Sequence, residues 1–214
     1  MKPKALDSPA QQAFALTRAI STFEDVKMFL RRALLVVLVI LCAPLTPAEN
    51  PDLVVFISVD QLRGDLPQKY KSRFGPDGFR RFYDHGAVYT NAHYRHAVTV
   101  TGAGHAALAT GANARENGII GNSWMDPATG KIVYCVQDPA HKLLGQPTSP
   151  TTGTSPANLL AQTLGDALVA ATNGQSRVFS VSGKDRSAIL MGGREGKAFW
   201  QDDEAGGFIT SDYY

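Results

Sequence analysis

Apolar runs separated by polar, glycine-rich segments divide the chain from residue 53 onward. The unbroken run 53–59 (LVVFISV) predicts a strand that is buried on both faces, and 177–182 (RVFSVS) predicts another. Apolar and polar residues alternate over 87–94, and a short apolar run at 97–101 predicts one more strand. Residues 122–136, with Pro-Ala-Thr-Gly near their middle, predict a hairpin.

Helical patterning lies between these strands. Residues 76–85 begin with Pro-Asp-Gly and are followed by Gly86, the small residues of 105–110 are followed by Gly111, and 157–171 carries leucines at helical spacing. Strands that alternate with helices predict an α/β fold with a largely parallel central sheet and flanking helices.

The amino end has the pattern of an export signal. An apolar run at 33–43 follows two arginines and precedes small residues, and it is shorter than the roughly 20 residues of a spanning helix. We expect a signal peptide at 28–48, an upstream extension at 1–27 and a periplasmic or secreted protein. An uncleaved anchor is the alternative, and no other membrane association is expected.

Charge and cysteine content narrow the function classes. The chain has 21 Lys and Arg against 19 Asp and Glu, but residues 49–214 carry 15 basic and 16 acidic side chains. A nucleic-acid-binding surface is therefore not expected. With Cys42 inside the signal, Cys135 is left without a partner in an oxidising compartment. It is either buried and inert or paired with sequence outside this chain.

Three chemically capable residues directly follow predicted strands or end them. Asp60 and Lys184 come after 53–59 and 177–182, and Thr101 stands where a strand passes into a helix. Ligands of α/β sheets gather at the carboxyl ends of strands, and a helix start binds anions. A threonine acts as a nucleophile only with a base or a metal. Simple turn and helix capping are the alternatives for Asp60 and Thr101.

Further polar groups accompany them. Lys184 and Arg186 suit phosphate oxygens, although a solvated basic pair is the common alternative. Asn122, after a glycine, is a turn residue or an amide donor. The histidines near Thr101 lack the spacing of a zinc motif, and His105 is expected to pack or orient its neighbours.

Residues 102–107 (GAGHAA) also match the glycine-rich dinucleotide pattern. The helix that follows ends after about two turns, at Gly111, and no strand ending in an acidic residue occurs about 20 positions later. A nucleotide cofactor is therefore not favoured.

Five blocks over residues 53–214, in the order and at intervals similar to those of the family, resemble the alkaline phosphatase superfamily. They are most similar to its secreted zinc phosphatases with a threonine nucleophile, the phosphate-irrepressible type. The blocks are Val54–Arg63, Thr99–Ala106, Glu116–Trp124, Ser182–Ile189 and Phe208–Tyr214.

The resemblance implies hydrolysis of phosphate monoesters of small molecules through a phosphothreonine at a two-zinc (Zn²⁺) site. Asp60 would be a zinc ligand, and Thr101 would be the nucleophile and would also touch zinc. Asn122, Lys184 and Arg186 would bind the phosphoryl oxygens. A type I phosphodiesterase or nucleotide pyrophosphatase of the same superfamily is the alternative, which Lys184 and Arg186 disfavour because a diester carries less charge.

Two departures from the family pattern stand out. Ala103 occupies a position that usually holds proline, and no histidine lies between Arg186 and Tyr214, although the family draws its remaining Asp and His ligands from later sequence. We expect residues 49–214 to be the amino-terminal part of the catalytic domain, which is incomplete. A non-catalytic truncated fragment is the further alternative, and the oligomeric state is left open.

The 214-residue chain alone is expected to show no phosphatase turnover. Asp60 and Thr101 would supply two ligands, whereas a zinc ion takes about four. Assays of the purified chain with and without added zinc test this, and zinc-dependent turnover would contradict it.

Overall fold

The computed structural model describes residues 27–28, 51–145 and 153–214. The chain divides into two units, residues 1–56 and 57–214, and each is described by itself. Residues 27–28 are helical, but the rest of the predicted extension and signal, 1–26 and 29–48, lies outside the described residues. In the described part of the chain, no helix is long and apolar enough to cross a membrane.

A four-stranded mixed sheet organises the second unit. Its strand order is β3 (Leu143–Leu144), β6 (Gly207–Ser211), β5 (Lys197–Asp202) and β4 (Phe179–Ser182). β4 and β5 pair in parallel, whereas β5 with β6 and β6 with β3 pair antiparallel. The α/β class with flanking helices is confirmed. The sheet formed by the described strands is mixed and not largely parallel, because only β4 and β5 pair in parallel.

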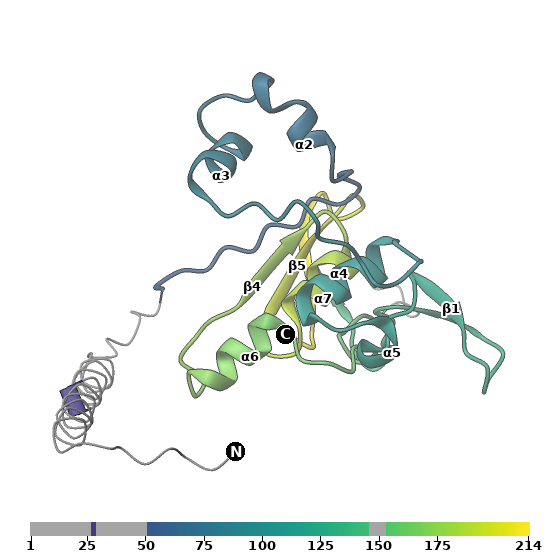
Figure 1. The fold of residues 1–214 in the computed structure, drawn as a ribbon. Helices are drawn as coiled ribbons and strands as arrows, with labels where there is room; N and C mark the ends of the chain where they lie inside the picture. Colours follow the sequence, from purple (N-terminus) through teal and green to yellow (C-terminus); the bar gives the residue numbers. More distant parts are fainter. Residues whose placement is uncertain (1–26, 29–50, 146–152) are drawn as a thin grey trace, which may run out of the picture. The chain divides into compact units, whose positions relative to one another are not determined.

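Helix α7 (Asp185–Gly192) connects the two parallel strands and packs on them. It contacts α4 (Thr101–Thr110) as well as β4 and β5 (Figure 1). A Cβ added at Gly192 would lie 3.2 Å from the Cβ of Ser180 in β4. The glycine therefore lets the end of α7 approach the sheet closely.

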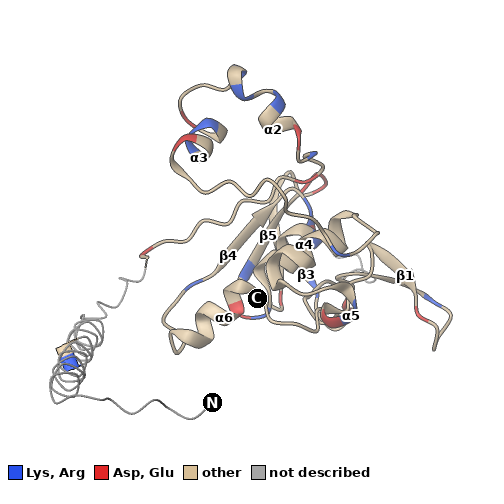
Figure 2. Ribbon diagram, in the orientation of Figure 1, with Lys and Arg blue, Asp and Glu red and all other residues tan. Residues whose placement is uncertain are grey.

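Short elements complete the unit. They are α2 (Leu66–Lys69), the 3₁₀ helix η1 (Lys71–Arg73), α3 (Phe79–His85), α5 (Ala114–Asn117), β1 (Ser123–Met125), β2 (Ile132–Tyr134) and α6 (Leu164–Ala171). Figure 2 shows basic and acidic residues close together on the α3 segment. Asp84 of α3 pairs with two cations, since it lies 3.4 Å from Lys71 Nζ of η1 and 3.1 Å from Arg80 Nε of α3.

The buried core lies among α4, α7, the sheet and the loops that follow α5 and β2. Its members are largely aliphatic, with one tryptophan and one cysteine: Ala106, Ile119, Cys135, Val136, Leu159, Ala188, Ile189, Leu190, Ala198, Trp200 and Ile209.

Several sequence predictions of local structure are confirmed. The helix expected at 76–85 is α3, the hairpin expected at 122–136 is β1–β2, and the strand expected at 177–182 is β4. The helix expected at 105–110 exists as α4 but begins four residues earlier, at Thr101.

Three predicted strands, 53–59, 87–94 and 97–101, are wrong for this structure. Leu53 and Ile57 are 77% and 64% exposed, and none of the described strands pairs with their segment. An apolar run indicates that a segment favours burial, but a strand also needs a neighbouring strand to form hydrogen bonds with its backbone N–H and C=O groups. The expected helix at 157–171 begins only at Leu164, because Thr163 caps it there.

A buried carboxylate fixes the start of α6 to the turn after α7. The backbone N–H of Thr163 donates to Asp166 Oδ2 (2.9 Å), and Asp166 N donates to Thr163 Oγ1 (3.1 Å). Asp166 Oδ1 also accepts from the N–H groups of Arg194 and Glu195, both at 2.8 Å. Asp166 is only 3% exposed, so its oxygens replace water for three backbone donors.

Replacing Asp166 with alanine is expected to cost about 3 kcal/mol of unfolding free energy, because three backbone N–H groups lose their acceptor. Urea denaturation measures this. Asp203→Ala removes an equal charge from an exposed site and serves as the matched control. Equal midpoints for the two variants would contradict the role given to Asp166.

Candidate active site

Asp60 and Thr101 face each other across the start of α4. The Thr101 hydroxyl donates to Asp60 Oδ2 (3.1 Å), and Asp60 Oδ1 accepts from Gln61 N (3.0 Å). Gln61 has a φ of 59°, a left-handed conformation that is uncommon for a residue other than glycine. Thr101 is the first helical residue and not the N-cap, which is Val100. Its hydroxyl is therefore directed to a side chain instead of capping the helix.

His105 ties this pair to the preceding segment. Its Nδ1 lies 2.9 Å from the Thr101 carbonyl oxygen, and its Nε2 lies 3.3 Å from Ser58 Oγ. Since a carbonyl only accepts, Nδ1 carries the proton and Nε2 accepts from the serine. The imidazole is 6% exposed, and its contacts are those of the orienting residue expected from the sequence.

Asn122 holds the first turn of α4. Its Oδ1 accepts from the Gly102 N–H at 2.7 Å, one of the amides that a helix leaves without an internal partner. A Cβ at Gly102 would lie 2.7 Å from the Gly121 carbonyl oxygen and 3.2 Å from Cys135 Sγ. Only glycine lets the helix start approach this turn so closely.

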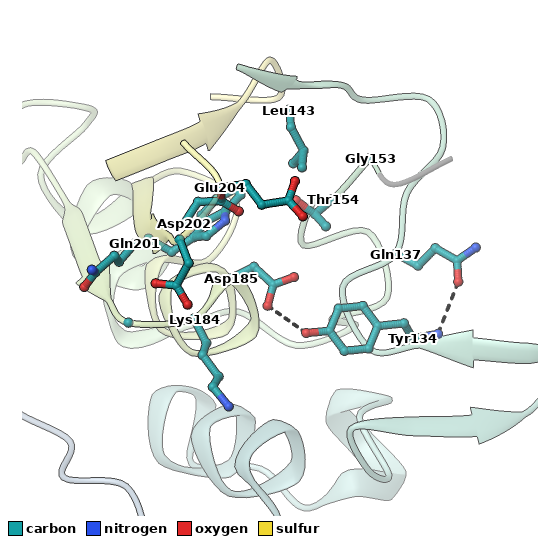
Figure 3. Close-up of a pocket in the computed structure, with 13 residues that line it drawn as sticks. Tyr134, Gln137, Leu143, Gly153, Thr154, Lys184, Asp185, Gln201, Asp202 and Glu204 are labelled. Carbon is teal, nitrogen blue, oxygen red and sulfur yellow. Dashed lines mark hydrogen bonds between the residues drawn. The ribbon is translucent and has the colours of Figure 1, made fainter. Parts of the chain in front are cut away.

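Lys184 and Arg186 stand at the start of α7, where Lys184 is the N-cap. Arg186 Nη1 donates to the Tyr134 hydroxyl (3.2 Å), and that hydroxyl donates to Asp185 Oδ1 (2.7 Å; Figure 3). Burial lowers the pKa of Arg186, but the hydrogen bond to Tyr134 and the negative charge of Asp185 help to outweigh it, so the pKa is raised. Arg186 is thus a fixed cation.

A cavity of about 760 Å³ opens beside this cluster. Tyr134, Lys184 and Asp185 line one part of it, and acidic residues of the β5–β6 turn, including Asp203 and Glu204, line another. Figure 3 shows the Lys184 side chain extending away from Asp202 and Glu204. The cavity wall therefore carries carboxyl groups of the β5–β6 turn as well as Lys184 and Asp185.

The β1–β2 hairpin brings the two groups of residues together. Cys135 follows β2, donates its N–H to the Asn122 carbonyl (2.9 Å) and packs against Gly102, while the adjacent Tyr134 binds Arg186. In the described part of the chain, the connection between Thr101 and Arg186 runs through this hairpin and not through a direct hydrogen bond. Sequence reasoning missed Tyr134, because a tyrosine in a hairpin strand carries no distinguishing signal.

The described residues do not complete a metal site. Among them, no three or more His, Cys, Asp or Glu side chains are grouped so that they could hold a metal ion. Asp60 and Thr101 offer two oxygen donors, which is part of the roughly four that zinc takes.

The comparisons with known proteins show which family the chain resembles. Residues 54–205 match the family model described as type I phosphodiesterase / nucleotide pyrophosphatase. The alkaline phosphatase PhoV of Synechococcus elongatus is 44% identical over 167 residues, and the alkaline phosphatase PafA of Elizabethkingia meningoseptica is 42% identical over 166 residues. Each match covers 77% of this chain.

The crystal structure of wild-type alkaline phosphatase PafA superposes with a TM-score of 0.68 at 44% sequence identity, covering 72% of this chain. The chain spans about 30% of the length of these relatives. The resemblance identified in the sequence is confirmed.

Cys135 reports on the packing between the hairpin and α4. It is 1% exposed, and burial, followed by the charge of Asp185, raises the pKa of its thiol to about 12. Of the two alternatives that the sequence left open for Cys135, the structure shows the buried thiol. We expect alkylation of Cys135 to stay slow up to about pH 10 in the folded chain, because the thiolate is the reactive form.

Mass spectrometry of the Cys135 peptide after iodoacetamide treatment, with and without urea, measures this protection. The urea-unfolded chain is the control and is expected to react fast above about pH 8.5, the ordinary pKa of a thiol. Equal rates in the two states would contradict the packing.

Proposed function

Because this chain belongs to the type I phosphodiesterase / nucleotide pyrophosphatase family of the alkaline phosphatase superfamily, we propose that it is part of a phosphate-monoester hydrolase with Thr101 as nucleophile. The observation that carries this proposal is the Thr101 hydroxyl, held 3.1 Å from Asp60 at the start of a helix whose first turn faces Asn122. Phosphorylated small molecules are the proposed substrates.

The proposed reaction has two displacements at phosphorus. Thr101 Oγ1 gives up its proton to solvent and forms a bond to phosphorus. The bond from phosphorus to the leaving alcohol oxygen breaks, and that oxygen takes up a proton from solvent. Water then attacks the phosphothreonine and releases inorganic phosphate and the free hydroxyl. Asp60 Oδ2 accepts the hydrogen bond of the Thr101 hydroxyl. This contact would direct the hydroxyl proton toward Asp60, so that a lone pair of the Thr101 oxygen could face the phosphorus atom.

Fixed donors would hold the phosphoryl oxygens. Since Asn122 Oδ1 is occupied by Gly102 N, the Nδ2 end of this amide is the one that can donate to a phosphoryl oxygen. Lys184 and Arg186 add two positive charges, which suit a doubly charged monoester. The first turn of α4 favours an anion at the same place.

Zinc is part of the proposal. Asp60 and Thr101 would supply two oxygen ligands, and the others would come from residues outside those that the structure describes. Bound there, zinc would lower the pKa of the threonine hydroxyl and stabilise negative charge on oxygen. Export of the protein to the periplasm or the exterior is likewise proposed, on the signal pattern at 28–48.

Phosphodiester hydrolysis is the second candidate, because the description of the matching family names phosphodiesterases. Lys184 and Arg186 favour monoesters over diesters, since a diester has one fewer ionisable oxygen for them to bind. The names of the relatives, alkaline phosphatases, support the same choice.

The test compares a monoester and a diester of the same nitrophenol, with zinc, in protein expressed from the complete reading frame that carries this sequence. We expect the monoester to be preferred, Thr101→Ala to lower kcat at least about 10³-fold, and Lys184→Ala to lower monoester kcat/KM about 10²-fold with less effect on the diester.

Thr90→Ala, an exposed threonine in a turn, is the matched control. A preference for the diester would support the second candidate. Activity that survives Thr101→Ala would refute the nucleophile, and no activity with either substrate would favour a non-catalytic fragment.

A further inference from the structure

Arg186 is held by an ordered pair of hydrogen bonds. Its Nη1 donates to Tyr134 Oη at 3.2 Å, and Tyr134 Oη donates to Asp185 Oδ1 at 2.7 Å. Asp185 Oδ1 also accepts from the backbone N–H of Arg186 at 2.7 Å. The hydroxyl proton of Tyr134 is thus committed to Asp185, which leaves an oxygen lone pair for the guanidinium.

Tyr134 binds only one edge of the guanidinium, at Nη1, and makes no hydrogen bond to the other edge. Nη1 lies on the edge away from the Nε–H bond, whereas Nε and Nη2 together form the fork that grips two oxygens of a carboxylate or phosphate. In the part of the chain that the structure describes, Arg186 Nε is buried and no group accepts its hydrogen bond. An unpaired buried donor is costly, so it marks a place for an acceptor that is not among the described residues, such as a phosphoryl oxygen.

Tyr134 is itself firmly placed. It ends β2, its N–H donates to Gln137 Oε1 at 3.3 Å, and its ring borders the cavity beside Lys184 and Asp185 (Figure 3). Burial and the charge of Asp185 raise the pKa of its hydroxyl. The hydroxyl therefore keeps its proton, and with it the direction of both hydrogen bonds, in alkaline solution.

We propose that Tyr134 is a positioning residue for monoester recognition: its hydroxyl, oriented by Asp185, holds Nη1 of Arg186 so that the Nε and Nη2 edge is presented to the phosphoryl group. The proposal rests on the proposed function, since it assumes that Arg186 binds the additional negative charge of a phosphate monoester. In this role the β1–β2 hairpin contributes to specificity, and Tyr134 acts on the substrate through Arg186.

The test is a double-mutant cycle of Tyr134→Phe and Arg186→Ala in the zinc-loaded protein from the complete reading frame. Tyr134→Phe keeps the ring and removes one hydroxyl. We expect it to lower monoester kcat/KM about tenfold and to change diester kcat/KM less than about twofold. In the Arg186→Ala background the same change is expected to have no further effect on the monoester.

Affinity for inorganic phosphate, measured by calorimetry, gives a second readout that does not depend on turnover. Tyr134→Phe is expected to weaken it by a similar factor and again to add nothing to Arg186→Ala. Tyr89→Phe is the matched control, because Tyr89 is 84% exposed. Urea midpoints of all variants are compared, so that a loss of folding is not mistaken for a loss of positioning.

The outcomes separate the two proposals. A wild-type protein that prefers monoesters and binds phosphate, with Tyr134→Phe unchanged or equally harmful in both backgrounds, would overturn the role of Tyr134 alone. Equal losses for monoester and diester would overturn it as well and indicate a general structural role. A wild-type protein that neither hydrolyses monoesters nor binds phosphate would refute the proposed function, and the role of Tyr134 with it.

Discussion

The close approach of helix α4 to the turn at residues 121–122 is the constraint on which the site depends. Gly102 leaves no space for a side chain, and its N–H is bound by Asn122. The helix start is therefore fixed against the turn, and Thr101 is fixed with it. A larger residue at 102 would push the helix away and move the Thr101 hydroxyl relative to Asp60.

The same turn leads into the hairpin that joins the two halves of the site. One end of the hairpin orients Asn122, and the other carries Cys135 against α4 and Tyr134 against Arg186. A small antiparallel hairpin thus couples the first turns of two helices, α4 and α7. Under the proposed function, both turns would direct positive potential, from the helix ends and from Lys184 and Arg186, toward the phosphoryl group.

The sequence singled out Asp60, Thr101 and Lys184 as candidates because they follow or end apolar runs, and this reasoning does not require each run to be a paired strand. Their chemical roles are part of the proposed function, whereas the boundaries of several elements were predicted wrongly. The run at 53–59 failed as a strand because pairing depends on a neighbour that no local pattern specifies. Helix α6 began later than its leucine spacing suggested, since the Thr163–Asp166 cap decides the start.

Tyr134 and Asp166 are residues whose roles the sequence did not predict at all. Their roles arise from contacts with residues far along the chain: Tyr134 with Arg186, and Asp166 with the backbone at 194 and 195. In a single sequence such residues look like any other tyrosine or aspartate. Only the fold brings their partners to them.

Acid quenching during turnover of a monoester, followed by peptide mass spectrometry, tests the central claim most directly. The account predicts phosphate bound covalently to Thr101 of the complete, zinc-loaded protein, and none in the Thr101→Ala variant. Phosphate on another residue, or steady turnover with Thr101 never modified, would contradict it.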